Sequence, residues 1–424
     1  MKTSAIILFA VTYLLLLAVP KYRAYIALAF ATAFVVLGIL PPENVLSAID
    51  WNVIFMIAGT MGVVGLFIES KMPSLLADIM IKRMPNVKWA IISLALFAGI
   101  ISAFVDNVAT VLMVAPVALT IAKKLKISPV PSIIAIAISS NLQGAATLVG
   151  DTTSILLGGF ADLNFLDFFY VDGRVGIFWV VEVGALVSTF VLMFLFRKEK
   201  QTIQGMERTE VKDYFPSVLL VGIIILMICA SFVPEQYKPK TINGIICMAL
   251  YAIGLLRNLI KTGNTGSLIK SIKEIDYSTI LLLTGLFVVI GGITEAGVVK
   301  DIGNLFIKLS NDNVFLIYTL IVWASVLFSA FIDNIPYVLT MLPVTAEISS
   351  QMGIEPNLLF FGLLIGATLG GNITPIGASA NITGLGILRK EGYEVSAPAF
   401  MKISVPFTLS AVITGYILNW LIWS

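Results

Sequence analysis

Long apolar segments recur along this 424-residue chain, and they constrain its fold more than any other feature. Hydrophobic residues make up 58% of the sequence and charged residues 12%, whereas a soluble domain carries about 25% charged residues. A helix needs about 20 apolar residues to cross a hydrocarbon core about 30 Å thick. Because the segments are continuous rather than alternating, they exclude a β-barrel. The sequence therefore predicts an all-α polytopic membrane protein.

One phrase inside the apolar segments occurs twice. Residues 102–107 read SAFVDN, and residues 329–334, which lie 227 positions later, read SAFIDN. A carboxylate at bilayer depth costs roughly 2.5–3.5 kcal/mol on insertion scales, so Asp106 and Asp333 need a compensating role. Matching polar interruptions in two halves of a chain are typical of transporters built from inverted repeats.

The repeat extends beyond this phrase. Residues 144–150 (GAATLVG) match residues 371–377 (GNITPIG) at the same offset. We therefore predict two inverted repeats of elevator type, residues 1–200 and 213–424, joined by a cytoplasmic linker at 201–212. Within them we expect scaffold spans in 1–87 and 213–312 and transport parts in 88–196 and 313–424.

Each repeat is expected to contain five transmembrane helices and one re-entrant hairpin. Five crossings per repeat invert the second repeat, and 21 of the 27 Lys and Arg residues, Arg23 among them, then lie on the linker side. This asymmetry predicts a cytoplasmic linker and external termini. The expected spans are 3–19, 22–40, 51–69, a broken 131–160 and 176–196, then 215–233, 242–260, 277–297, a broken 357–388 and 403–423, with hairpins at 88–122 and 314–346 and amphipathic pieces at 72–87 and 299–311.

Composition narrows the chemistry of any site. The net charge of +2 gives no electrostatic support for binding nucleic acid. Histidine is absent, so a proton relay must use Asp or Glu. The two cysteines lie in separate apolar segments and cannot form a thiolate metal site. We expect no cofactor other than a coupling H⁺ or Na⁺, and no enzymatic activity.

The two hairpin tips are the first candidate sites. Asp106, Asn107, Asp333 and Asn334 offer hard oxygen ligands that suit Na⁺ or a proton, beside backbone groups that lack helical partners. The alternative role is structural, because Asp and Asn also cap helix N-termini. Both roles can coexist.

Gly-rich, hydroxyl-rich stretches interrupt the two broken spans and form the second candidate element. Close helix packing would also explain the glycines, although it would not explain Asp151. Glu182 lies in a plain span and is either a coupling residue or an interior contact. The full set of candidate substrate- or ion-binding residues is Ser102, Asp106, Asn107, Asn141, Thr147, Asp151, Thr152, Thr153, Ser329, Asp333, Asn334, Asn372, Thr374, Ser379 and Asn381.

The repeats differ at one informative position. Asp151 corresponds to Ala378, so the first repeat carries two candidate carboxylates and the second carries one. Like-charge repulsion and desolvation disfavour ionising neighbouring carboxylates together. One of them can therefore exchange a proton for a cation, which an antiporter requires.

With these motifs in view, the chain resembles the ion transporter superfamily, in the branch of arsenical pump membrane proteins, the P protein and citrate–metal symporters. The phrases that carry the resemblance are SAFVDNVATVLMVAP, GAATLVGDTTSILLGG and LGGNITPIGASANI. The resemblance implies an elevator-type carrier, often a homodimer. Related divalent-anion/sodium symporters carry Ser-Asn-Thr at the hairpin tips, where this chain has Asp106-Asn107-Val108 and Asp333-Asn334-Ile335, which argues against a simple dicarboxylate substrate.

We therefore predict a secondary active transporter coupled to H⁺ or Na⁺, with arsenite or antimonite efflux as the leading function. A Na⁺/H⁺ antiporter, a citrate or dicarboxylate uptake carrier and, from another class, an ion channel are the alternatives. The expected location is the cytoplasmic membrane of a prokaryote. The expected partners are the lipid bilayer, a second copy of the chain and, for an arsenical pump, a soluble ATPase subunit.

Overall fold

The structure, a computed structural model, describes residues 1–202, 209–211, 213–263, 265–273 and 275–424. Within the predicted linker 201–212, residues 203–208 and 212, including Arg208 and Lys212, lie outside the described residues. The first half of the chain forms α1 (Lys2–Ala18), η1 (Pro20–Tyr22), α2 (Arg23–Val36), η2 (Pro42–Asn44), α3 (Val45–Ala48), α4 (Trp51–Glu69), α5 (Met72–Ile81), α6 (Val87–Ser102), α7 (Asn107–Leu125), α8 (Val130–Gly144), α9 (Thr152–Phe160), η3 (Leu166–Phe168), a two-stranded antiparallel sheet of β1 (Tyr170–Val171) and β2 (Arg174–Val175), and α10 (Ile177–Leu195).

The second half repeats this order. It forms α11 (Phe215–Ser231), η4 (Glu235–Tyr237), α12 (Ile242–Thr262), α13 (Thr265–Lys273), α14 (Tyr277–Glu295), α15 (Val298–Ser310), α16 (Val314–Ser329), α17 (Asn334–Met352), α18 (Pro356–Leu364) with the π-helical segment η5 (Ile365–Leu369), α19 (Ser379–Lys390) and α20 (Ala397–Trp423).

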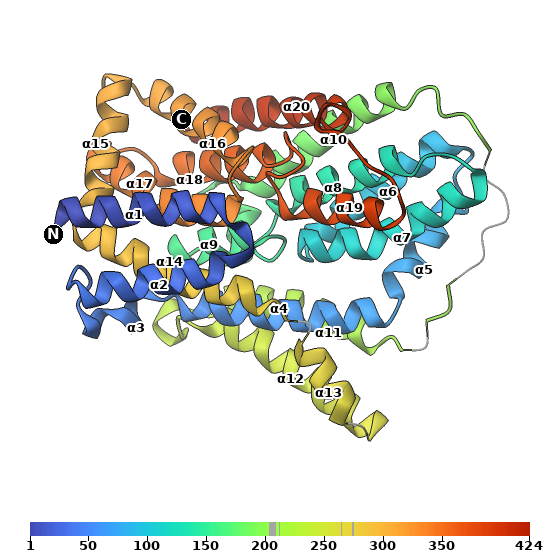
Figure 1. Ribbon diagram of the computed structural model, residues 1–424, viewed down its shortest axis with the longest axis horizontal. Helices are drawn as coiled ribbons and strands as arrows, with labels where there is room; N and C mark the ends of the chain where they lie inside the picture. Colours follow the sequence, from blue (N-terminus) through green and yellow to red (C-terminus); the bar gives the residue numbers. More distant parts are fainter. Residues whose placement is uncertain (203–208, 212, 264, 274) are drawn as a thin grey trace.

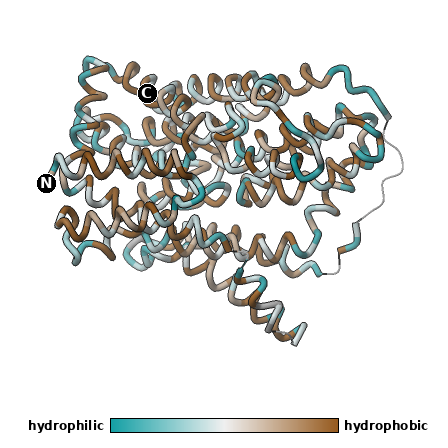
Figure 2. Tube along the Cα trace, in the orientation of Figure 1, coloured by the Kyte–Doolittle hydropathy of each residue, from teal (hydrophilic) through white to brown (hydrophobic). Residues whose placement is uncertain are grey.

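The helices have the length and composition of membrane spans. In the described part of the chain, six helices (α4, α7, α10, α12, α14 and α20) are each long and apolar enough to cross a bilayer. Two further helix pairs pass the same test but bend sharply, α1–α2 by 114° and α15–α16 by 118°. Hydrophobic residues run along the helices and hydrophilic residues collect at the connections (Figure 2). The chain is an all-helical, multi-span membrane protein with bent and re-entrant helix pairs.

Both predicted hairpins are present, with the Asp-Asn phrases at their tips. α6 and α7 are joined by residues 103–106, and α16 and α17 by residues 330–333, so the bounds of the two hairpins repeat at an offset of 227. The hairpins point toward each other from opposite ends of the molecule (Figure 1). The N- and C-termini both lie toward the end opposite the connection that follows α10 (Figure 1).

The predicted broken spans are also present. Between α8 and α9, residues 145–151 are not helical, and residues 371–378 interrupt the chain between η5 and α19. Thr147 donates its hydroxyl to the carbonyl of Ala103 in the first hairpin tip, and Thr374 donates in the same way to Ala330 in the second. Each interruption is therefore tied to the tip of its own hairpin.

The second and third expected spans of the two repeats pack together through pseudo-symmetric glycine contacts. α12 packs along α4, and α14 packs along α2. A Cβ on Gly59 of α4 would lie 2.4 Å from the backbone of Cys247 in α12, and one on Gly285 of α14 would lie 2.6 Å from the backbone of Ala27 in α2. Only glycine permits this approach, and small residues fill the same role at membrane helix interfaces generally.

One part of the structure differs from the expected topology. Arg23 was expected with the linker-side cations, but it forms an ion pair with Asp333 at the tip of the second hairpin. The turn between α1 and α2 lies near the middle of the long axis of the molecule rather than at the linker end (Figure 1). The physical reason is length, because α2 has only 14 residues, which span about 21 Å.

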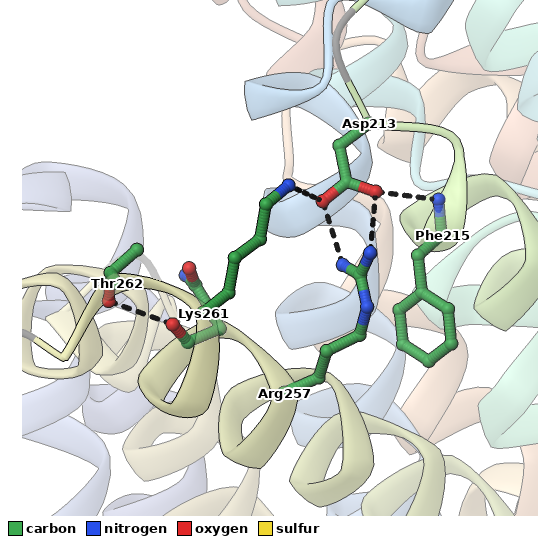
Figure 3. Close-up of polar contacts among 6 residues, drawn as sticks. Asp213, Phe215, Arg257, Lys261 and Thr262 are labelled. Atoms are coloured by element: carbon green, nitrogen blue, oxygen red, sulfur yellow. Dashed lines mark hydrogen bonds and ion pairs between the residues drawn. The ribbon is translucent and has the colours of Figure 1, made fainter.

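A charged cluster fixes the start of the second repeat (Figure 3). Asp213 accepts hydrogen bonds from Arg257 at 2.7 and 3.1 Å, from Lys261 at 2.9 Å and from the backbone nitrogen of Phe215 at 3.0 Å. The Arg257 guanidinium, with help from Lys261, holds the pKa of the Asp213 carboxyl well below its usual range. The cluster joins the beginning of α11 to the end of α12, so it lies wholly within one repeat.

The glycines of the two interruptions give a stability prediction. A Cβ on Gly150 would lie 2.6–2.8 Å from the carbonyls of Gly144, Ala103 and Ser102, and Gly377 meets the equivalent three carbonyls at 2.6–2.7 Å. We expect Gly150→Ala and Gly377→Ala each to destabilise the protein by about 1–3 kcal/mol, because the hairpin tip must move away. Thermal unfolding of the purified protein in detergent measures this loss.

Gly386→Ala is the matched control. Gly386 lies in α19, and nothing lies within 4 Å of the position of its added Cβ. Alanine is favoured over glycine in a helix interior, so this variant should unfold at the same or a higher temperature. Equal melting of all three variants would contradict the tight contact at the interruptions.

Candidate transport site

Both hairpin tips and both interruptions contribute to one cavity of about 540 Å³. Asp106 and Asn107 come from the first tip and Asn334 from the second, while Asp151 and Ser379 come from the ends of the two interruptions. The scaffold side of the cavity is formed by α4, from Met61 to Glu69, and by Asp276 and Thr279 at the start of α14. The cavity thus lies between the two groups of helices that the sequence assigns to scaffold and transport parts.

Asp106 caps α7. Its Oδ2 accepts hydrogen bonds from the backbone nitrogens of Val108 and Ala109 at 3.0 and 3.1 Å. The structural role considered from sequence is therefore real, and the carboxylate also lines the cavity. Asn107 is buried beside it and donates its side-chain amide to Asn141 of α8 at 2.9 Å. The first tip is thereby fixed to the first broken helix.

Asp333 caps α17 in the same manner but has a different surrounding. Its Oδ1 accepts a hydrogen bond from the backbone nitrogen of Ile335 at 3.1 Å, and its Oδ2 forms an ion pair with Arg23 of α2 at 2.5 Å. The hydroxyl of Ser379 lies 3.5 Å from the same oxygen. Because Arg23 occupies Oδ2, Asp333 does not line the cavity, although its neighbour Asn334 does.

The two broken helices cross and hold each other through buried hydrogen bonds. Asn141 donates its amide to the carbonyl of Thr368 at 2.6 Å, and Asn372 donates to the carbonyl of Ile138 at 2.9 Å. The hydroxyls of Thr153 and Thr368 lie 2.9 Å apart. The bond from Asn141 gives a partner to the carbonyl of Thr368, near the end of the second broken helix, and all three bonds join buried polar groups, as an apolar environment requires.

Asp151 connects this crossing to the cavity. It is buried, and its carboxylate caps α9 by accepting a hydrogen bond from the backbone nitrogen of Thr152 at 2.7 Å. It accepts a second hydrogen bond from the hydroxyl of Thr153 at 3.0 Å. Ala378 takes the equivalent place in the second repeat, so only the first repeat carries a carboxylate there. A buried carboxylate that lines a cavity is able to accept and release a proton.

The fifteen predicted site residues divide into two groups. Six of them line the cavity: Asp106, Asn107, Asp151, Thr152, Asn334 and Ser379. Asp333 pairs with Arg23, and the other eight lie behind the cavity wall. There Asn141, Thr153 and Asn372 hold the broken helices together, Thr147, Thr374, Ser102 and Ser329 contact hairpin or broken-helix groups, and Asn381 donates to the carbonyls of Gly371 and Thr374.

Sequence reasoning missed several cavity residues. Glu69 and Asp276, at the end and the beginning of a span, are not among the candidate residues from the sequence, yet both line the cavity. Asp276 also caps α14, and Lys270 pairs with Glu69 at 2.5 Å. Only their positions facing the hairpin tips reveal this role. Glu182 does not line the cavity and, among the described residues, has no hydrogen-bond partner, so its role stays open.

The cavity is acidic. Four carboxylates line it, from Glu69, Asp106, Asp151 and Asp276, and no Lys or Arg does so among the described residues. Asp151 is buried and Asp106 half-buried, whereas Glu69 and Asp276 are exposed and Lys270 pairs with Glu69. Carboxylates that have no cation beside them attract cations and repel anions. In the same part of the chain no group of three or more Asp, Glu, Cys or His residues is arranged to hold a metal ion.

A cavity that carries carboxylate, amide and hydroxyl groups among apolar side chains, between re-entrant hairpins and broken helices, is typical of a multi-pass secondary transporter. The chain belongs to the CitMHS family, described as citrate transporters, whose model matches residues 13–366. It is 31% identical to a protein called an uncharacterized transporter of Mycobacterium tuberculosis, over 99% of this chain and 98% of that protein. It is 26% identical to the human P protein over 92% of this chain and 56% of that protein.

The fold is similar to a solved transporter structure. The YdaH transporter of Alcanivorax borkumensis superposes with a TM-score of 0.62 at 13% sequence identity, covering 95% of this chain and 96% of that chain. These findings confirm the superfamily that the sequence motifs indicated and establish that the protein is a transporter rather than an enzyme. It is an integral, multi-pass membrane protein, and it has bacterial relatives.

The two roles of Asp106 can be separated by mutation. We expect Asp106→Asn to keep the helix cap and abolish coupled transport, because Asn is as good a cap as Asp but carries no charge. Asp106→Ala should also lose about 0.5–2 kcal/mol of stability. Thermal unfolding and flux in proteoliposomes measure the two effects. If Asp106→Asn transports at the wild-type rate, the carboxylate serves only as a cap.

Proposed function

We propose that this protein is an H⁺- or Na⁺-coupled carrier of elevator type that exports arsenite or antimonite. The supporting observation is the acidic cavity, which is lined by four carboxylates and, among the described residues, by no Lys or Arg; only one of the four, Glu69, has a cation paired with it, Lys270. A neutral or cationic substrate meets no repulsion there, whereas a bare dicarboxylate does. Arsenous acid is neutral and can bond to the polar groups of Asn107, Asn334, Thr152 and Ser379.

Thiolates play no part in this recognition. Cys229 lies in α11 and Cys247 lies buried in α12 at the contact with α4, and neither lines the cavity. Substrate binding therefore depends on hydrogen bonds from amides and hydroxyls.

In the elevator cycle that we propose, two inverted repeats of five crossings and one hairpin each supply a scaffold and a moving transport part. Helices α1–α5 and α11–α15 form the scaffold, and helices α6–α10 and α16–α20 carry the cavity groups past it. The coupling ion binds at the hairpin tips, through Asp106 and Asn107 and through Asp333 and Asn334. The protein works as a homodimer in the cytoplasmic membrane of a prokaryote.

Uptake of citrate together with a divalent cation is the second candidate. The family description favours it, since the model that matches residues 13–366 is named for citrate. A complex with Mg²⁺ carries less negative charge than citrate alone, so the four carboxylates of the cavity repel it less.

A flux assay on proteoliposomes distinguishes the candidates. We expect saturable counterflow of arsenite or antimonite, driven by an inward H⁺ or Na⁺ gradient, and no counterflow of citrate without a divalent cation. Counterflow of citrate only with Mg²⁺ would replace the first proposal with the second, and Na⁺/H⁺ exchange without either substrate would indicate an antiporter. Passive flux that shows no counterflow would indicate a channel.

Asp151 gives a test of coupling. We expect Asp151→Asn to flatten the pH dependence of transport between pH 5.5 and 8.5. The variant should keep the fold, because the amide oxygen can still accept the hydrogen bond from the Thr152 nitrogen at the start of α9. Ala378→Asp, which adds a carboxylate at the equivalent place in the second repeat, is the matched comparison. Full pH-dependent transport by Asp151→Asn would rule out Asp151 as the proton carrier.

A further inference from the structure

The pseudo-symmetric counterpart of the transport cavity is a second cavity of about 530 Å³. It lies between α14 and the later turns of α17 and α9, where it is lined by Ile290, Leu339 and Leu156 among others. The two cavities differ in depth. The transport cavity reaches Asp106 and Asn334, whereas the second meets α17 only at Leu339 and Pro343 and does not reach either hairpin tip.

The exposed fractions of two equivalent side chains show the same difference between the cavities. Leu112 lines the transport cavity and is 47% exposed, and Leu339, its counterpart 227 residues later, lines the second cavity and is 4% exposed. The structure therefore has one side open to the hairpin tips and the opposite side closed.

α1 and the elbow between α1 and α2 contact the second hairpin, whose helix α17 lines the closed cavity. Arg23 pairs with Asp333 at 2.5 Å, and the side chains of the pair are only 26% and 10% exposed. Ten residues earlier, the hydroxyl of Tyr13 donates to the carbonyl of Pro336 at 2.8 Å and also contacts the hydroxyl of Thr340. The elbow thus holds the tip and the first two turns of α17. Among the described residues no Lys or Arg pairs with Asp106 at the other tip.

We infer that Arg23 and Tyr13 form a gate latch between the scaffold and the second hairpin, and that this latch opens and closes once in each transport cycle. The inference rests on the proposed alternating carrier. While Arg23 pairs with Asp333, its positive charge disfavours a coupling cation at the same carboxylate, so the guanidinium acts as a tethered counter-charge while this side is closed. When the latch opens, the Asp333 carboxylate becomes available to the coupling ion. Arg23, which belongs to the scaffold helix α2, then no longer contacts the hairpin tip.

Reporter cysteines at Leu112 and Leu339 test the latch in a background with Cys229 and Cys247 replaced. The probe is a membrane-impermeant maleimide applied to the protein in nanodiscs, where both faces are accessible. In the parent protein we expect Leu112→Cys to react quickly and Leu339→Cys slowly. Arg23→Gln should slow the first reaction and speed the second, each by at least threefold, because the closed side is no longer held.

Two further variants sharpen the test. Tyr13→Phe removes only the hydroxyl. Like Arg23→Gln, it should slow the reaction at Leu112→Cys and speed the reaction at Leu339→Cys. Asp333→Asn should match Arg23→Gln, and the double variant should shift the rates no further than either single change, because both remove one interaction. Arg257→Gln, which breaks the scaffold-internal pair with Asp213, should leave both rates unchanged.

The inference is overturned if Arg23→Gln leaves both rates within 1.5-fold of the parent, or if both reporters become fast together, which indicates loss of the fold. Failure of the proposed function is a separate outcome. If the parent protein shows no counterflow but the two labelling rates exchange as expected, the latch is supported and the carrier proposal is not.

Discussion

The structure depends on satisfying backbone groups where two helices are interrupted in an apolar environment. A lipid-surrounded helix that stops at mid-depth leaves carbonyl and amide groups without partners, and each unsatisfied group costs several kcal/mol. Here Thr147 and Thr374 tie the interruptions to the hairpin tips, and Asn141 and Asn372 tie the broken helices to each other. These bonds bring four helix ends to one place, and the transport cavity exists because they meet there.

The two repeats share a backbone but differ in charge. Asp106 and Asp333 both cap the helix that follows, yet only Asp333 has a cation beside it. Asp151 adds a carboxylate that the second repeat lacks. Inverted repeats allow a carrier to have two related conformations, whereas differences in charge make those conformations unequal in energy. For the proposed carrier, we therefore expect direction and coupling to depend on the residues at which the repeats diverge.

The chemistry of the cavity and the name of the family point to different substrates. A citrate carrier must compensate three negative charges, and the described residues of the cavity supply carboxylates instead. The two cations beside these groups are already paired, Arg23 with Asp333 and Lys270 with Glu69. A shared fold does not determine the substrate, which depends on the groups placed in the site. A neutral molecule, a cation or a metal complex is consistent with those groups.

The sequence by itself determined the membrane class, the repeat, both hairpins and both interruptions, because apolar length and a repeated motif are visible in the order of residues and need no knowledge of tertiary contacts. It also identified six of the seven polar residues that line the cavity from these elements and missed Thr383 of α19. It did not reveal that Glu69 and Asp276 face the same cavity or that Arg23 leaves the linker side to pair with Asp333. Those facts depend on how the short α1–α2 elbow and the end of α4 pack against the hairpins. Only the tertiary structure decided them, because burial and charge pairing arise from contacts between residues that are distant in sequence.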